Sequence, residues 1–197
     1  MKKMISMTLA MVMAFSLLPG CAKGGDDRTE PTTVATEAVV TGPASALELM
    51  QTVWDNYAED QKFAVMGGGM ENPVDGGPGS VPLDEEGISY SLLIPEEQLA
   101  NVTEVVSMIH MMNANTFTSA AYKLAEGVSV EAFAAAMKDA IMNNQWMCGF
   151  PDRLLIESVP GGYVVVAFGK EDPMASFKTN LTAVYPDTTE LVNEPIL

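Results

Sequence analysis

Apolar positions after residue 44 follow two periods, one typical of helices and the other typical of strands. Four stretches place apolar side chains three or four residues apart, and each begins with a residue that suits a helix N-terminus. Four shorter runs are rich in apolar and β-branched residues, which favours strands. The predicted helices are 45–60, 95–109, 129–141 and 172–185, and the predicted strands are 88–94, 116–124, 154–159 and 163–168.

Glycine and proline mark two breaks in this pattern. The last two predicted strands are joined by Pro160-Gly161-Gly162, which predicts an antiparallel hairpin. Residues 66–87 contain the runs MGGGM, NP and DGGPG, a density of Gly and Pro that predicts a long loop.

The order of these elements predicts a single α+β domain over residues 45–197. Helices and strands alternate, and the final hairpin requires antiparallel pairing. We expect two layers, with a mixed four-stranded sheet that ends in the hairpin and helices packed mainly on one of its faces.

The first twenty residues have the composition of an export signal. Lys2 and Lys3 precede an uncharged apolar core at 4–18, and Gly20 comes directly before Cys21. This core is shorter than the ~20 residues that span a bilayer as a helix, so the pattern indicates a secretory signal peptide. The segment resembles a bacterial lipoprotein signal, although Pro19 departs from that pattern. The resemblance implies cleavage before Cys21 and a lipid on its thiol. The lipid would hold the protein on the extracytoplasmic face of the cell membrane.

Residues 21–44 separate this signal from the predicted domain. They are rich in Thr, Pro, Gly and acidic residues, contain no aromatic residue and show no helical or strand period. The sequence therefore predicts a signal peptide at 1–20, a lipidated disordered tether at 21–44 and one domain at 45–197.

Charge and cysteine content limit the classes of partner. Removal of the signal leaves eight Lys and Arg residues against 26 Asp and Glu. Such a surface disfavours nucleic acid and anionic lipid headgroups and favours a cationic protein or peptide partner. Cys148 is the only cysteine besides Cys21, so the fold depends on its apolar core and not on an intramolecular disulfide.

Several segments of the domain resemble one family of exported proteins. These segments are FAVMGGGM (63–70), NANTFTSAAYKL (113–124), NQWMCGFPD (144–152) and GGYVVVAFG (161–169). They are similar to a family of small lipoproteins of Gram-positive anaerobes, which is grouped as a domain of unknown function. Some members are labelled bacteriocin transport accessory proteins. The resemblance implies export and anchoring, and it assigns no catalytic role to any residue.

The sequence offers little material for catalysis or metal binding. His110 is the only histidine, and a nucleophilic pair with Cys148 would require the two side chains to touch. Met108, His110, Met111 and Met112 are soft ligands of the kind that suit Cu(I), but no ligand motif is repeated. We therefore predict no catalytic residue, no metal site and no cofactor.

Two segments are candidates for ligand binding. Met66 and Met70 place apolar side chains on the glycine-rich loop, and loops on a rigid scaffold often carry binding. Trp146 and Phe150 flank Cys148, and two interpretations of this cluster remain open. It is either a core corner with a buried, inert thiol or a partner-binding edge.

These residues favour a lipid-anchored extracytoplasmic accessory or binding module without catalytic activity. The alternative is an extracytoplasmic hydrolase or metal-handling protein whose site is assembled from scattered residues.

Overall fold

The predicted hairpin lies in the interior of the sheet. Strands β6 (Arg153–Val159) and β7 (Tyr163–Gly169) pair antiparallel on either side of the Pro160–Gly162 turn, as predicted. Every residue of β7 is buried. Val164 and Val166 belong to the core on one face of the sheet, while Val165 and Ala167 belong to the core on the other. An apolar run buried on both sides requires a cover on both faces.

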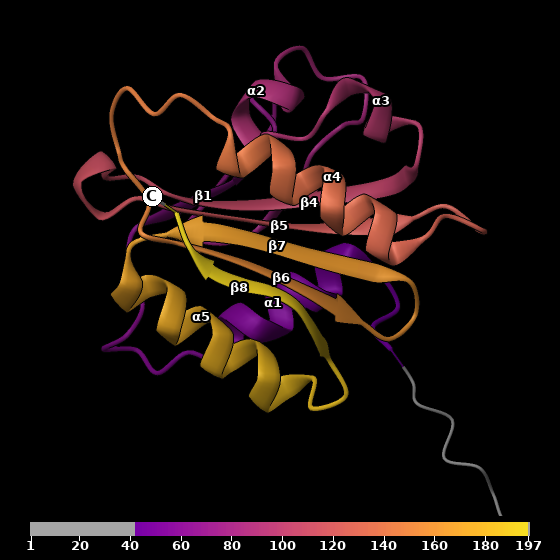
Figure 1. The fold of residues 1–197 in the computed structure, drawn as a ribbon. Helices are drawn as coiled ribbons and strands as arrows, with labels where there is room; N and C mark the ends of the chain where they lie inside the picture. The colour runs from indigo at the N-terminus through magenta and orange to yellow at the C-terminus, as the bar shows by residue number, and fades with distance from the viewer. Residues whose placement is uncertain (1–41, 197) are drawn as a thin grey trace, which may run out of the picture. The chain divides into compact units, whose positions relative to one another are not determined.

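The computed structural model describes residues 42–196 (Figure 1). The predicted signal peptide, Cys21 and most of the predicted tether lie outside this range. At its start, Gly42 lies against the β6–β7 turn, since a Cβ on Gly42 would be 2.1 Å from the carbonyl oxygen of Pro160. The described chain therefore begins at the end of the sheet where this turn lies.

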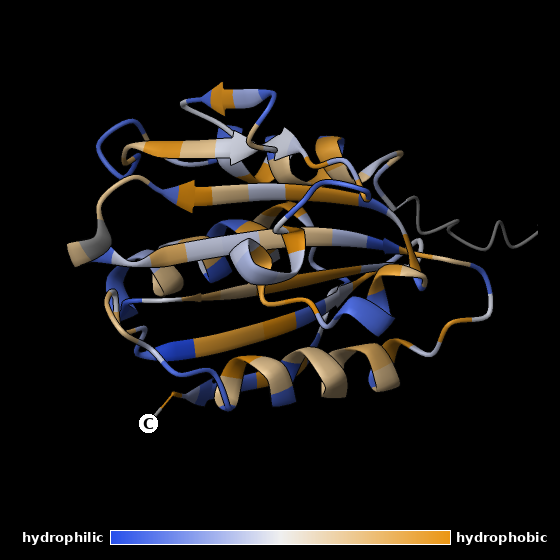
Figure 2. Ribbon diagram, turned by 90° about the horizontal axis from the view of Figure 1, so that it is seen from above, coloured by the Kyte–Doolittle hydropathy of each residue, from blue (hydrophilic) through white to orange (hydrophobic). Residues whose placement is uncertain are grey.

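Within residues 42–196, eight strands form one antiparallel sheet (Figures 1 and 2). Its order is β2-β1-β4-β5-β7-β6-β8, and β3 also pairs with β4. The α+β class is confirmed, but the predicted mixed four-stranded sheet is wrong in both strand number and pairing. The other strands are β1 (Val65–Gly68), β2 (Pro73–Asp75), β3 (Gly79–Ser80), β4 (Val102–His110), β5 (Phe117–Leu124) and β8 (Thr189–Pro195).

Helices cover both faces of the sheet. Helices α1 (Ala46–Asp55) and α5 (Glu171–Val184) lie on one face (Figure 1). Helices α2 (Ile88–Leu92), α3 (Glu96–Leu99) and α4 (Val130–Met142) lie on the other. The predicted two-layer arrangement with helices mainly on one face is therefore wrong, because the apolar runs of the central strands need a second layer of helices.

Helices α1, α4 and α5 and strand β5 occur where the sequence predicts them. Two of these helices begin with the side-chain caps expected from their sequences. The backbone N–H of Glu48 donates to Ser45 Oγ at 3.1 Å, and that of Ala132 donates to Ser129 Oγ at 3.2 Å.

Two neighbouring predictions between residues 88 and 109 are wrong. The predicted strand at 88–94 is helix α2, which is bounded by left-handed residues, Gly87 with φ 86° and Leu93 with φ 55°. The predicted helix at 95–109 contains only the short α3, followed by β4. Adjacent residues of β4 are buried on opposite faces of the sheet. Its apolar positions therefore also fit a helical spacing, so periodicity alone cannot distinguish a helix from a strand here.

The glycine-rich segment is folded and not a long loop. It supplies β1, β2 and β3, and a Cβ on Gly67 would lie only 2.3 Å from the backbone nitrogen of Gly79. Glycine here allows two backbones to approach closely, whereas the density of glycine and proline in the sequence predicted a loop. Strand β8, after the last helix, was not predicted either.

Candidate functional site

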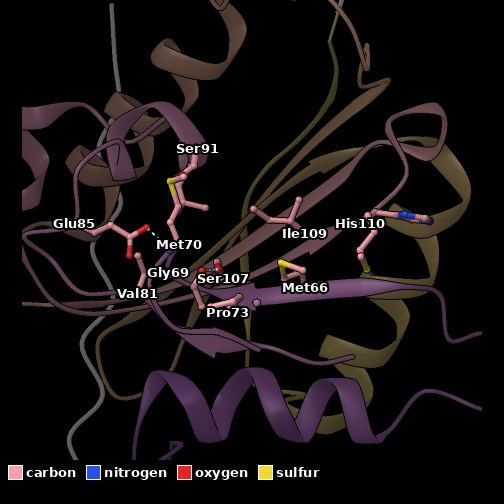
Figure 3. A pocket seen from close by; sticks show the side chains of 14 residues that line it. Met66, Gly69, Met70, Pro73, Val81, Glu85, Ser91, Ser107, Ile109 and His110 are labelled. Atoms are coloured by element: carbon pink, nitrogen blue, oxygen red, sulfur yellow. Dashed lines mark hydrogen bonds between the residues drawn. The ribbon is translucent and has the colours of Figure 1, made fainter. Parts of the chain in front are cut away.

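An apolar pocket of about 500 Å³ lies over β1 and β4, beside α2 (Figure 3). On this face of the sheet, α4 packs on β6, β7 and β8, and α2 packs on β5. The pocket occupies the neighbouring part of the same face, where β1 and the C-terminal half of β4 form its floor. The arrangement of the helices therefore leaves this edge of the sheet hollow.

Methionine side chains from three places in the chain line this space, which we call the methionine pocket. Met66 comes from β1, Met70 from the segment after β1, and Met111 from the turn after β4. Their exposed fractions are 39%, 83% and 53%. Methionine is unbranched and polarizable, and it adapts to ligands of different shape. The remaining apolar lining side chains are Pro73, Val81, Leu92 and Ile109.

The floor of the pocket is made of small residues. Gly67, Gly68 and Gly69 add no side chains, and Ser107 on β4 is only 1% exposed. The Ser107 hydroxyl donates to the carbonyl oxygen of Gly68 at 3.2 Å, which ties β4 to β1 and satisfies the buried hydroxyl. Small residues at these positions preserve the depth of the pocket.

One carboxylate, that of Glu85, lies at the Met70 end of the pocket (Figure 3). Its Oε1 accepts a hydrogen bond of 2.8 Å from the backbone N–H of Met70. Its Oε2 is buried and has no hydrogen-bond partner among the described residues. A Cβ on Gly69 would lie 1.7 Å from Oε2, so the carboxylate occupies the space that a side chain at position 69 would take.

His110 lies at the other end of the pocket, but its ring points away from it (Figure 3). The ring stacks on Phe63 with centroids 4.8 Å apart, and Nδ1 accepts from the backbone N–H of Met112 at 3.0 Å. Burial lowers the pKa of His110 below its usual value. Both burial and acceptance at Nδ1 favour the neutral ring with its proton on Nε2, and the bond to Met112 holds the turn after β4.

Trp146 and Phe150, the other predicted ligand-binding residues, lie elsewhere. Trp146 lines a separate hollow beyond α2 and packs on Phe168 with ring centroids 5.5 Å apart. Phe150 is exposed and lines neither hollow. The structure thus places Met66 and Met70 in one pocket, whereas Trp146 and Phe150 lie outside it.

The remaining chemical candidates do not form a site with one another. Cys148 is exposed in the segment after α4 and belongs to neither apolar core, which contradicts its interpretation as a buried core thiol, although the nearby Trp146 packs against one core. It lines the Trp146 hollow, whereas His110 lines the methionine pocket. Met108 is fully buried in the core beneath α1, while Met111 and Met112 are exposed, so these methionines do not share one copper site.

Sequence reading found one part of the pocket and missed the rest. Met66 and Met70 were identified as apolar side chains on a glycine-rich segment. Ser107 and Ile109 were missed because residues 95–109 were assigned to a helix, and Met111 was considered only as a soft metal ligand. The density of β-branched residues in 102–109 is the signal that would have indicated a strand and its alternating faces.

No family model, no curated protein and no solved structure matches this chain. The resemblance to the lipoprotein family therefore stays a prediction. Within residues 42–196, no three His, Cys, Asp or Glu side chains gather in a way that would hold a metal ion. None of the helices in this part of the chain has the length and apolar content needed to cross a bilayer.

Proposed function

We propose that this protein is a lipid-anchored extracytoplasmic binding module that holds an apolar group of its ligand in the methionine pocket and carries out no catalysis. The observation that carries this proposal is the pocket itself, a space of about 500 Å³ lined by Met66, Met70 and Met111. Ligand sites of this size are mostly apolar with a few polar groups that orient the ligand. Glu85 is such a group here.

One end of the pocket lies far from the point where the described chain begins. The chain enters the domain at Gly42, beside the β6–β7 turn. Met111 lies at the opposite end, because Ile109 pairs with Thr118, which pairs with Phe168 near the far end of β7. Phe168 lies six residue steps beyond Gly162, the last residue of the turn, a distance of roughly 20 Å at 3.4 Å per residue. The Met111 end of the pocket therefore lies at the end of the sheet opposite Gly42.

Binding of a neutral fluorescent probe tests the pocket. The mature chain with Cys21→Ser, which stays in solution, is titrated with N-phenyl-1-naphthylamine, whose fluorescence rises in an apolar site. We expect saturable binding, and a Met66→Gln/Met111→Gln variant should bind at least about tenfold more weakly because two apolar walls become polar.

The matched control is Met112→Gln/Met147→Gln, which replaces two exposed methionines that do not line the pocket. It should bind the probe as the parent chain does. Equal losses in both double variants, or no saturable binding at all, would remove the support for a binding module.

Membrane fractionation in the native host tests the anchor. Wild-type protein should sediment with membranes, and Cys21→Ala should release it, because the acyl chains on Cys21 supply the attachment. Retention of the Cys21→Ala variant in the membrane fraction would show that the anchor assignment is wrong.

A further inference from the structure

A second hollow adjoins the methionine pocket, and it is acidic. Its volume is about 710 Å³, and Met70 and Glu85 line both spaces. An apolar space and an acidic space therefore meet at the Glu85 carboxylate. The other residues that line the acidic hollow are Glu71, Pro82, Asp84 and Glu86.

The described chain supplies no counter-charge to this hollow. Residues 42–196 contain six Lys and Arg side chains, and five of them form ion pairs with acids elsewhere. The sixth, Lys123, donates to the carbonyl oxygen of Gly161. A cation for the acidic hollow has to come from another molecule. The five ion pairs are Lys62–Glu59, Lys138–Glu194, Arg153–Glu171, Lys170–Asp152 and Lys178–Glu190.

Glu85 has the geometry to receive such a cation. The Met70 N–H fixes Oε1, while Oε2 is buried without a hydrogen-bond partner in the described part of the chain. A buried carboxylate oxygen without a partner carries a desolvation cost, which a bound ammonium or guanidinium group would offset. The neighbouring Glu71, Asp84 and Glu86 add attraction for further positive charge.

The arrangement of the acids favours several single charges over one metal ion. In residues 42–196 no three acidic, His or Cys side chains converge on a point where a metal ion would be coordinated. Carboxylates spread along a groove instead suit successive Lys or Arg side chains. Each hollow has the volume of a site for a drug-sized ligand, so the two together match a peptide segment of several residues.

We propose that the ligand is a cationic amphipathic peptide segment. Its apolar side chains fill the methionine pocket against Met66 and Met70, and a Lys or Arg that follows them binds Glu85. This inference rests on the proposed function and adds to it the chemical class of the ligand.

Calorimetric titration with two matched peptides tests the inference. Both are acetylated peptide amides that begin with two leucines, followed by either three lysines or three glutamines. The mature chain with Cys21→Ser should bind the lysine peptide at least about tenfold more tightly than the glutamine peptide at low salt. Salt at 0.5 M should reduce this preference, since it screens the charges of a partly open groove.

Two variants locate the effect at Glu85. Glu85→Gln keeps an oxygen for the Met70 N–H but removes the charge, so it should lose most of the preference for lysine and still bind the glutamine peptide. Gly69→Ala leaves the charge unchanged but displaces the carboxylate, and it should lower the preference as well. Glu126→Gln is the matched control, because it removes one exposed charge that lines neither hollow.

Three results would overturn the inference, and they separate it from the proposed function. Equal binding of both peptides, with both weakened by Met66→Gln/Met111→Gln, would reject the cation and leave the apolar pocket in place. Equal effects of Glu85→Gln and Glu126→Gln would attribute the preference to overall charge. Binding of the neutral probe without binding of either peptide would reject the peptide alone, whereas failure of the probe as well would reject the binding module.

Discussion

The central hairpin and the glycine-rich edge belong to one sheet but are built in opposite ways. In β7 every residue is buried, and its side chains fill both cores of the molecule. In β2 every residue is exposed, and Met66 of the adjacent β1 is partly open to solvent. Side chains hold the hairpin between its helices, whereas at the edge the absence of side chains lets backbone meet backbone, as at Gly67 and Gly79.

This difference separates the scaffold from the surface that we propose binds ligand. Well-packed apolar side chains give the hairpin a single arrangement. The edge instead combines a backbone positioned by close glycine contacts with flexible methionines that have no fixed neighbours on their open side. A rigid floor beneath adaptable side chains suits a site that accepts ligands of varied shape.

The largest expected effect is a truncation in the scaffold. Phe177 of α5 is fully buried, with its ring 5.4 Å from that of Phe117. Phe177→Ala should lower the free energy of unfolding by about 3–5 kcal/mol, because it removes apolar contacts and leaves a cavity. Urea denaturation measures this value. Met66→Ala at the edge should cost less than about 1 kcal/mol, and equal losses at the two sites would show that the two regions do not differ as described.

A smaller effect is expected where the edge depends on glycine. Gly67→Ala places a Cβ against the Gly79 backbone, which cannot move aside as a flexible side chain would. We expect a loss of about 1–3 kcal/mol in the free energy of unfolding, together with weaker binding of the neutral probe. Gly77→Ala is the control, because its Cβ would meet the Trp54 and Gln51 side chains at 3.8–4.0 Å, which is ordinary contact. Equal stabilities of the two variants would contradict the close approach of β1 and β3.

A pH-dependent effect is expected at a buried acid within the scaffold. Glu157 of β6 is 2% exposed and lies opposite Glu190 of β8. Burial, and next the charge of Glu190, raise the pKa of Glu157, while Lys178 and Thr188 act in the opposite direction with smaller effect. The folded chain therefore holds this proton more tightly than the unfolded chain does. The contribution of Glu157 to stability is thus present below its unfolded pKa and is lost as pH rises through the raised folded pKa.

Replacing this acid should remove that dependence. Glu157→Gln should flatten the decline of stability with rising pH and add about 0.2–1 kcal/mol at pH 7, the range for like charges opposite each other in a sheet. Thermal unfolding at a series of pH values measures the change, with Glu126→Gln as an exposed control. A steeper decline in the Glu157→Gln variant would show that the sign is wrong.

The smallest effect on stability is expected at Cys148. This thiol is exposed in the segment after α4, so a thiol reagent should label one equivalent in the folded Cys21→Ser chain and leave the unfolding midpoint almost unchanged. Labelling is followed by absorbance with an aromatic disulfide reagent, and Cys148→Ala should abolish it. Labelling that proceeds only as fast as the chain unfolds would place the thiol in a core instead.

Local sequence was sufficient for elements whose pattern has one interpretation. Pro160-Gly161-Gly162 between two apolar runs specified the hairpin, and Ser45 and Ser129 marked the starts of α1 and α4. Residues 88–109 were misassigned because Ile88–Ile94 has a strand-like composition and β4 is apolar on both faces. Met66 and Met70 were recognised as a pair, but the pocket around them contains residues from β4 and α2 that local patterns do not connect.

The sequence by itself determined the class of the domain, its hairpin, most of its helices and its strongly acidic composition, because these follow from apolar periodicity, turn residues and residue counts. Only the tertiary structure decided that residues 42–196 form an eight-stranded sheet, that helices cover both of its faces and that a glycine run serves as packed strands. It also decided that Met66, Met111 and Glu85 line one pocket. The physical reason is that the spacing of apolar residues shows which faces of an element are apolar, whereas the segments that cover those faces come from distant parts of the chain.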